Sequence, residues 1–456
     1  MNELHFFHFN ALLQSSGWLS PAYVGVDTSG TIQYLSDKAP SDPVSMEYVN
    51  GYVLPGFQNA HSHAFQYAMA GRAETHQAGA SDDFWSWREA MYACALSMDP
   101  DQMQAVATML YAEMLRKGYT HVAEFHYLHH DKNGKPYSNL SEMGLRLVEA
   151  ASVAGIRITL IPVFYQKGGF GKDPQPRQRR FISKTIEDYF HLLDDSADAI
   201  KNYSHANLGF SVHSLRAVDA KDIIGTFNEG PKNIPFHLHV AEQLKEVEDC
   251  VGFLKQRPVE WVLNNLPVDE RFHLVHCTHM NDDEVKRLAN SGAHAVLCPG
   301  TEGNLGDGIF RLTDFYSHNG SWSIGTDSHI SLNPLEDLRW LDYAQRFTTH
   351  KRNTFDDGAS ILIGKTIKAG RKAMGTDTKD FFAAGQPFDA VIFHSKSATL
   401  AHGNLSHVLS GILYTTDSSD ISGTIVNGKW VVKDQHHLRG REIKSSFIST
   451  MKKITF

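Results

Sequence analysis

His61 and His63 are separated by a single serine and follow an apolar run, residues 52–55, that is typical of a strand. In an extended segment, side chains two residues apart project from one face, about 6.6 Å apart along the backbone. Two imidazoles at that spacing can bind one cation. The alternative is a pair of exposed loop histidines, which the pair alone does not exclude because the chain contains 26 histidines.

Polar residues also follow five further apolar runs. They occupy positions 124–127 (Glu-Phe-His-Tyr), 213–216 (His-Ser-Leu-Arg), 237–242 (His-Leu-His-Val-Ala-Glu), 276 (His) and 325–329 (Gly-Thr-Asp-Ser-His). Within them, His239 and Asp327 would complete a set of three nitrogens and one oxygen with His61 and His63. A catalytic zinc ion is bound by such donors and keeps one position for water. The sequence therefore predicts a metal site.

Alternatives to this ligand set stay open. His237 shares one face with His239, which is preferred because it lies nearer the end of its run. Asp327 could instead cap a helix that starts near Leu335. A carbamylated lysine can bridge two metal ions, but no lysine lies at the end of the fourth or fifth run. This favours one metal ion per chain. Zinc is the first candidate, and iron or another divalent ion suits the same ligands.

The elements that must position these residues alternate along the chain. Asp99 as N-cap, Pro100 in the first turn and Gly118 as a stop mark one clear helix. Such an alternation of strands and helices predicts an α/β (β/α)8 TIM-like barrel, with its chemistry at the C-terminal strand ends. A doubly wound sheet is the alternative, but the chain has no GxGxxG turn. The eight apolar runs are residues 53–54, 121–123, 156–161, 208–212, 234–240, 272–275, 294–297 and 322–325.

Both ends of the chain predict β-structure. Residues 22–26 and 31–35 flank a turn, and the dipeptide Asn427-Gly428 separates two β-branched runs, as in a tight hairpin. We expect residues 1–55 and 384–456 to form one small β-sandwich domain, with the catalytic barrel, residues 56–383, inserted between them. The segment 167–180 is rich in glycine, proline and charge, and is either a loop over the active site or a plain surface loop.

The bulk composition limits the partners. The chain is 42% hydrophobic and 21% charged, as in globular proteins, and its net charge of −8 includes no long like-charge block. These values argue against general binding of nucleic acid or anionic membranes. No apolar run approaches the ~18 residues that span a bilayer, and the first residues lack a signal-peptide pattern. Four scattered cysteines without a CxxC motif predict reduced thiols and a cytoplasmic protein.

A family resemblance rests on these same residues. The His-x-His pair, the His-x-x-Glu from His239 to Glu242, His276 and Asp327 resemble the mononuclear deaminase branch of the amidohydrolase superfamily. The chain resembles, in particular, the formimidoylglutamate deiminase family, and the resemblance covers essentially its whole length. The segments that carry it are 61–66, 84–92, 123–131, 213–218 and 304–310. One segment, 298–303, departs from the pattern at Pro299 and Gly300.

The resemblance implies hydrolysis of N-formimino-L-glutamate to N-formyl-L-glutamate and ammonia, a step of histidine degradation, by a homodimer. It implies that Asp327 takes a proton from water, that His276 stabilises the attacking oxygen and that Glu242 binds the amidinium as general acid/base. Glu242 could instead be a helix-start carboxylate, and Arg88 could stack on aromatics and pair with Glu89 or Glu113. For the dicarboxylate substrate, the implied binding residues are Arg216, then Gln66, Arg88, Tyr127 and His213.

Two other functions are compatible with parts of the pattern. A deaminase of a ring substrate, such as guanine or an adenosine-like purine, would favour stacking aromatics and amide contacts. Arg216 beside His213 favours a carboxylate instead. A non-catalytic scaffold on the same fold would be expected to have lost metal ligands, whereas here the four ligands and both proton-transfer groups are present.

Overall fold

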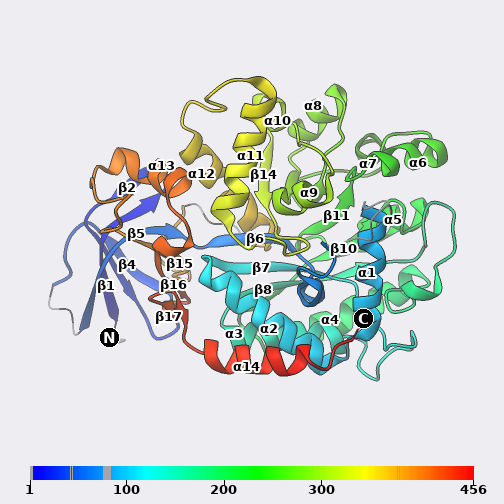
Figure 1. Ribbon diagram of the computed structural model, residues 1–456, viewed down its shortest axis with the longest axis horizontal. Coiled ribbons are helices and arrows are strands. Elements are labelled where there is room, and N and C mark those ends of the chain that lie inside the picture. The colour runs from blue at the N-terminus through cyan, green and yellow to red at the C-terminus, as the bar shows by residue number, and fades with distance from the viewer. Residues whose placement is uncertain are drawn as a thin grey trace.

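The computed structural model describes residues 4–41, 43, 45–74, 84–376, 378 and 380–455. It has two parts that lie side by side (Figure 1): a β-sheet built from both ends of the chain, and a barrel wrapped by helices. The side chains of Phe84 and Trp85, in one of the segments that carry the family resemblance, lie outside the described residues.

Parallel strands form the barrel that the sequence predicts. Its two edge strands, β6 and β14, meet at an isolated parallel bridge between Ser62 and Asp327, where the Asp327 N–H donates to the His61 carbonyl at 3.0 Å. The short β9 (Ala206–Leu208) pairs with β8. In order around the barrel the strands are β6 (Phe57–Ser62), β7 (Tyr119–His126), β8 (Arg157–Phe164), β10 (Phe210–Ser214), β11 (Phe236–Val240), β12 (Phe272–His276), β13 (His294–Leu297) and β14 (Ser321–Ile324).

The expectation that residues 53–54 belong to the first barrel strand is wrong. They lie in β5 (Ser45–Pro55), which pairs with β1 (His5–Gln14) and β15 (Ala390–His394) of the other sheet. The chain passes from one sheet to the other at Gly56, where a side chain would not fit because its Cβ would lie 2.2 Å from Thr120. Both strands are buried there, so hydrophobicity does not show which sheet each one joins.

The sheet from the chain ends is mostly antiparallel, and its order is β18-β17-β16-β15-β5-β1-β3-β4, with β2 on β1. Both predicted hairpins are present, and Asn427-Gly428 forms the second turn with positive φ at both residues. The sheet folds over so that the Phe7 ring lies 6.4 Å from Trp430 and 5.7 Å from Phe388. Its remaining strands are β2 (Gly17–Leu19), β3 (Ala22–Val26), β4 (Ile32–Ser36), β16 (Ile421–Val426), β17 (Lys429–Lys433) and β18 (His436–His437).

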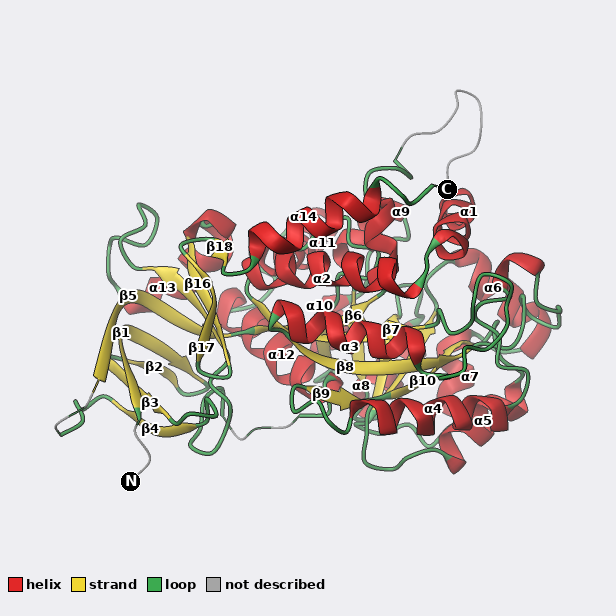
Figure 2. Cartoon of the chain, turned by 90° about the horizontal axis from the view of Figure 1, so that it is seen from below, coloured by secondary structure: helices red, strands yellow, loops and turns green. Residues whose placement is uncertain are grey.

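Helices surround the barrel (Figure 2). The helix predicted from Asp99 is α2, and the Asp99 side chain accepts the Gln102 N–H within a capping box. The last helix, α14, packs along α2, and its Phe447 ring lies 5.8 Å from Tyr67. Among the described residues, we find no helix with the length and apolarity that crossing a bilayer requires.

The helices that matter for the site or the predictions are α1 (Phe84–Ser97), α2 (Pro100–Arg116), α6 (Leu244–Leu254), α9 (Pro299–Leu305), α11 (Pro334–Thr349) and α14 (Gly440–Met451), with the 3-10 turns η1 (Ala64–Met69) and η2 (Pro176–Gln178). The others are α3 (Glu142–Ala154), α4 (Ile186–Ile200), α5 (Ala220–Glu229), α7 (Pro258–Asn265), α8 (Asp282–Asn290), α10 (Leu312–Ser317), α12 (Gly358–Ala373) and α13 (Leu405–Thr415). Pro299 starts α9, so the departure from the family pattern leaves a regular helix there.

Three stacked imidazoles fill the barrel near the N-terminal ends of its strands. The ring of His273 lies 4.8 Å from that of His237 and 5.0 Å from that of His294. His237 Nε2 bonds to the Ala373 carbonyl at 3.2 Å, and His294 Nδ1 bonds to the Ser321 hydroxyl at 2.8 Å. Burial lowers the pKa of His237 to about 3 and that of His294 to about 4. We call these three residues the floor histidines.

Candidate metal centre and substrate cavity

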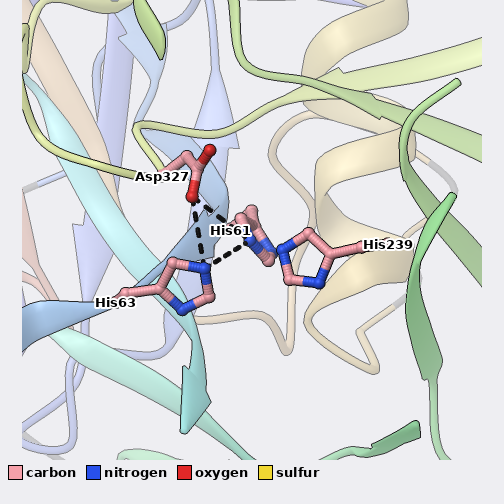
Figure 3. A group of neighbouring side chains, drawn as sticks. All are labelled: His61, His63, His239 and Asp327. Atoms are coloured by element: carbon pink, nitrogen blue, oxygen red, sulfur yellow. Dashed lines mark hydrogen bonds and ion pairs between the residues drawn. The ribbon is translucent and has the colours of Figure 1, made fainter. Parts of the chain in front are cut away.

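His61, His63, His239 and Asp327 converge at the opposite end of the barrel, where the strands end (Figure 3). One possible ligand atom from each lies within 4.8 Å of the others. The Nε2 atoms of His61 and His63 are 3.0 Å apart, and Asp327 Oδ1 lies 3.6 Å and 3.2 Å from them. The structure thus brings together all four residues that the sequence proposes as ligands. His237 is the exception among the candidates, because it belongs to the floor histidines.

The tautomers of two of these histidines follow from their outer hydrogen bonds. His63 Nδ1 lies 2.9 Å from the Phe125 carbonyl, and His239 Nδ1 lies 3.0 Å from the His213 carbonyl. A carbonyl only accepts, so each Nδ1 carries the hydrogen and each Nε2 turns a lone pair to the cluster. Such lone pairs, next to a carboxylate oxygen, repel one another unless they share a cation. The donor set therefore fits a divalent metal ion.

Burial keeps His61 and His239 neutral. It lowers the pKa of His61 well below its ordinary value, and the charges of His63 and His239 act in the same direction. Burial also lowers the pKa of His239. Neutral imidazole is the form that coordinates a metal, so the ligand form dominates at neutral pH.

Glu124, at the end of β7, fixes the backbone of the His-Ser-His segment. Its carboxylate accepts the Ser62 hydroxyl and the Ala64 N–H, both at 2.6 Å, and the Tyr111 hydroxyl at 3.0 Å. Burial raises the pKa of Glu124 to about 7 although these donors oppose the shift. The two bonds on either side of His63 limit where its ring can point.

The backbone is strained at the strand ends around the cluster. Asp327 has φ 46°, His276 has φ 71° and Ala241 has φ 55°, in the left-handed region that non-glycine residues rarely adopt. This conformation turns the chain sharply after each strand. Asp327 does not cap a helix, because the side chain that caps α11 is that of Asn333, which accepts the Leu335 N–H.

His276 lies beside the cluster and faces three carboxylates, one of which is Asp327 of the cluster. Its Nε2 is 3.7 Å from Glu242 Oε1 and 3.8 Å from Asp327 Oδ2, and its Nδ1 is 3.3 Å from Glu302 Oε1. Burial alone would lower the pKa of His276, but Glu242, Glu302 and Asp327 raise it to about 10. A protonated His276 carries a positive charge toward the place where an attacking oxygen would become negative.

Glu242 is not the carboxylate that starts helix α6. That position belongs to Glu246, which accepts the N–H groups of Ala241 and Glu242 at 3.1 Å each. The Glu242 side chain lines the cavity, and burial raises its pKa. A second buried carboxylate, Asp307, offers a ligand atom within 4.8 Å of those of Glu242 and His276, and burial followed by the charge of Glu242 raises its pKa to about 9.

One cavity adjoins the cluster, and the structure places every substrate-binding residue proposed from the sequence in its wall. Gln66, Arg88, Tyr127, His213 and Arg216 line it with His63, His239, Asp327, Glu242 and His276. The Gln66 amide donates to the Tyr127 hydroxyl at 2.9 Å. The cavity therefore combines possible metal ligands with carboxylates, guanidinium groups and amide or hydroxyl groups.

Two guanidinium groups give one part of the cavity a positive character. Arg216 Nη1 lies 3.4 Å from Glu246 Oε2, and although burial opposes it, Glu246 and Glu242 raise the pKa of Arg216. The Arg88 guanidinium carbon lies 5.6 Å from the ring centroid of Tyr92. The two carboxylates that the sequence offers to Arg88 have other partners: Glu89 pairs with Arg177, and Glu113 pairs with Arg116.

The sequence reading missed several residues of the cavity wall. Met91 and Tyr92 follow Arg88 on α1 by three and four residues, and Trp87 precedes Met91 by four, so helical spacing would have found them. Tyr165 comes directly after β8, a barrel strand whose end carries no charged residue. Phe181 and Leu305 complete the wall. A search limited to ionisable residues at strand ends misses such aromatic and apolar positions.

Arg180 anchors α1 to the rest of the site. It is fully buried, and its guanidinium donates to the carbonyls of Ala95, of Met98 at 2.7 Å and of His130 at 2.8 Å. Ala95 belongs to the last turn of α1. The segment 167–180 thus contributes an anchor through Arg180 and is not a plain surface loop.

Comparison with known sequences identifies the family. The model of the amidohydrolase family matches residues 52–431. A formimidoylglutamate deiminase of Pseudomonas aeruginosa is 40% identical over 445 residues, which are 96% of this chain and 97% of that protein. A 5-methylthioadenosine/S-adenosylhomocysteine deaminase of Haloarcula marismortui is 24% identical over 90% of this chain and 86% of its own.

Solved structures show the same relationship. The crystal structure of an amidohydrolase from Brucella melitensis has a TM-score of 0.91 at 38% sequence identity, and the match covers 99% of both chains. An adenosine deaminase from Xanthomonas campestris with bound zinc has a TM-score of 0.82 at 18% identity over 99% of this chain and 98% of that one, a likeness of fold. Matched by the family model over most of its length and by a relative at 40% identity, the chain is a hydrolase of the amidohydrolase family.

Proposed function

We propose that this hydrolase acts on the C–N bond of N-formimino-L-glutamate and releases N-formyl-L-glutamate and ammonia. The observation that carries the proposal is the composition of the cavity: Arg88, Arg216 and Glu242 line it together with three proposed metal ligands, His63, His239 and Asp327. The substrate has two carboxylates for the guanidinium groups and a cationic amidine for the carboxylate. The 40% identical relative is named for this activity.

We propose one divalent metal ion per chain, with zinc as the first choice. His61, His63, His239 and Asp327 would hold it, since their donor atoms lie together and fit zinc. When bound, the ion supplies Lewis acidity that makes water a nucleophile near neutral pH.

The residues around the cluster would move the protons. Asp327 accepts a proton of the attacking water, while His276 donates a hydrogen bond to the developing negative oxygen. The water oxygen forms the new bond to the amidine carbon. Glu242, which pairs with the amidinium, then takes the hydroxyl proton of the tetrahedral intermediate and passes it to the departing nitrogen. As the C=O bond forms, the C–N bond breaks and ammonia leaves. The two carboxylates of the substrate would be held by Arg216 and Arg88, with Gln66, Tyr127 and His213 as neutral partners.

We propose that the chain acts in histidine degradation, in the cytoplasm, as a homodimer. Two large apolar side chains on one face of α11, Trp340 at 52% and Phe347 at 71% exposure, adjoin the exposed Ile309 and offer a surface for a second copy. Sedimentation of the parent and of Trp340→Glu tests the dimer.

We further propose that residues 56–383 act as the catalytic barrel domain and that residues 1–55 and 384–456 act as the small β-domain.

Ammonia release from N-formimino-L-glutamate by metal-quantified protein tests the proposed reaction. We expect turnover by the parent with about one metal ion per chain. In Arg216→Met, we expect kcat/KM to fall about 100-fold or more because a charge-assisted carboxylate contact is lost. The matched control is Arg287→Met, which removes a surface guanidinium that pairs with Asp283 at 3.3 Å and is expected to leave kcat/KM unchanged.

The outcomes separate the parts of the proposal. Turnover by the parent with an unaffected Arg216→Met enzyme keeps the reaction and refutes this carboxylate site. A metal-loaded parent that releases ammonia from guanine or adenosine, and none from N-formimino-L-glutamate, assigns the chain to ring deaminases. A parent that binds no metal and turns over no substrate would support a non-catalytic role.

A further inference from the structure

Two tyrosines, Tyr92 and Tyr165, lie at the end of the cavity away from the proposed metal ligands. Their hydroxyl groups have no role in the reaction proposed above. Ring contacts lead outward from His239 to His213, at 4.9 Å between centroids, and from His213 to Tyr165, at 4.5 Å. Tyr165 and Tyr92 both line the cavity and are almost completely buried. Tyr92 shares this wall with Arg88, whose guanidinium carbon lies 5.6 Å from its ring centroid.

Gln178 of η2 joins the two phenols from behind the wall. Its Nε2 donates to the Tyr92 hydroxyl at 3.1 Å and to the Tyr165 hydroxyl at 2.9 Å. Its Oε1 accepts the backbone N–H of Gln175 at 2.8 Å. Because a backbone N–H only donates, the oxygen end of this buried amide is fixed, and the NH2 end must face the phenols.

This arrangement decides where the phenol hydrogens point. The two hydrogens of the amide go one to each phenol oxygen, so each phenol must direct its own hydrogen elsewhere. Even if one phenol donates to the other, at least one hydroxyl hydrogen remains for the cavity that both line with Arg88 and Arg216. Burial and the neighbouring Tyr92 raise the pKa of Tyr165, which therefore stays a donor at neutral pH. Donors and positive charge together suit an anion.

We propose that Tyr92 and Tyr165, oriented by Gln178, bind with Arg88 the substrate carboxylate that lies farther from the amidine. This inference rests on the proposed function and deepens it. With the amidine at Glu242 and the metal ligands, the carboxylate at the end of the glutamate side chain is the group that reaches the far wall. Gln178 is then a positioning residue, because it acts on the substrate only through the two hydroxyl groups.

Gln178→Glu tests this assignment with little change in size. The new carboxylate accepts hydrogen bonds, so both phenols turn their hydrogens back to it and away from the cavity, and it adds a negative charge behind the anion site. For N-formimino-L-glutamate we expect kcat/KM to fall about 10- to 100-fold, mainly through a higher KM. For N-formimino-L-glutamine, whose side chain ends in a neutral amide, we expect less than about a threefold change.

Three further variants complete the experiment. Gln175→Glu introduces the same charge three residues away on the same loop, where the side chain is exposed, and is expected to behave like the parent. Tyr92→Phe and Tyr165→Phe each remove one oxygen. We expect at least one of them to lower the preference for the glutamate over the glutamine derivative about tenfold. If Gln178→Glu does not fold, these two variants still test whether the tyrosine hydroxyl groups bind the carboxylate.

The failures are distinguishable. If the parent turns over N-formimino-L-glutamate and the Gln178 and tyrosine variants prefer it over the glutamine derivative as strongly as the parent does, the far wall is not the carboxylate site and the proposed reaction stands. If the parent releases no ammonia from N-formimino-L-glutamate, the proposed reaction and this inference are both overturned.

Discussion

At the scale of single residues, the site depends on groups that hold the ligands as much as on the ligands themselves. Phe125 and His213 act on this site through their backbone carbonyls, which set the tautomers of His63 and His239. Glu124 contributes three hydrogen bonds around the His-Ser-His segment without touching either ring nitrogen. Outer contacts of this kind tune a metal site because they fix the direction of the first ligands.

The Glu124→Gln variant tests that role. An amide accepts at one end only, so one of the bonds from Ser62 and Ala64 is lost and the ring of His63 gains freedom. We expect the affinity for zinc, measured by competition with a chelator, to fall about 10- to 100-fold. Tyr111→Phe removes a single, more distant donor and should have a much smaller effect. An unchanged zinc affinity in Glu124→Gln would show that Glu124 has no part in metal binding.

The sequence predicts some residues of this site and not others. The spacing of His61 and His63 and the strand-end positions of His239 and Asp327 were sufficient to predict which residues converge. Helical spacing from Arg88 leads to Tyr92. Tyr165 has no such signal, because a tyrosine directly after a strand has the pattern of ordinary core. Gln178 acts through a pair of hydrogen bonds whose partners are far apart in the sequence, and no local pattern encodes them.

At the scale of elements, α1 is the helix whose placement matters most for the cavity. It carries Trp87, Arg88, Met91 and Tyr92 into the wall. Its C-terminal end is tied down by Arg180, which donates to carbonyls at the end of α1 and just beyond. Arg180 makes these bonds while fully buried, so the carbonyls have no water to replace the guanidinium.

We therefore expect Arg180→Met to affect both stability and substrate binding. Leaving three buried carbonyls without their donor should lower the free energy of unfolding by about 2–4 kcal/mol. Because α1 loses its anchor, KM should rise several-fold more than kcat falls. The matched control is Arg179→Met, since Arg179 also donates to carbonyls, those of Lys132 and Pro176, but at an exposed position. Urea unfolding and steady-state kinetics measure both effects, and equal stability of the two variants would contradict the role.

The boundary between the two sheets illustrates what patterns of hydrophobicity cannot resolve. The alternation of strands and helices was enough to predict the barrel, and the Asn427-Gly428 turn was enough to predict the hairpin at residues 421–432. The run at residues 52–55 was placed in the wrong sheet because β5 and β6 are both buried there and adjoin without a loop. Only the close approach of Gly56 to Thr120 marks the change, and that contact is tertiary.

At the scale of the whole molecule, the floor histidines predict acid sensitivity. Burial holds the pKa values of His237 and His294 at about 3 and about 4, below the value near 6.5 in the unfolded chain. As the pH falls below about 6.5, the unfolded state takes up protons that the folded state does not, so the stability falls. Between about pH 6.5 and its pKa in the folded state, each histidine lowers the free energy of unfolding by up to about 1.4 kcal/mol for each pH unit of acidification. Above about pH 6.5 it has no such effect.

Equilibrium unfolding between pH 7.5 and 4.5 measures this effect. We expect His294→Asn to lose less stability on acidification than the parent, by about 1.4 kcal/mol per pH unit below pH 6.5. The exposed His350→Asn, in a left-handed position that asparagine also tolerates, is expected to follow the parent curve. Identical slopes for parent and His294→Asn would mean that His294 does not couple folding to pH.

The seam between β6 and β14 has a consequence for how the molecule is made. His61 and His63 are on the first barrel strand or directly after it, and Asp327 follows the last, where it bridges Ser62. During synthesis on a ribosome, a chain that has emerged only as far as β13 contains the three histidines but lacks the carboxylate and cannot close the barrel. The cluster of the four proposed ligands is therefore completed together with the barrel, and the β-sheet of the chain ends is completed later, when β15 to β18 are synthesised. An ion that needs all four proposed ligands would therefore bind only a chain whose barrel is complete.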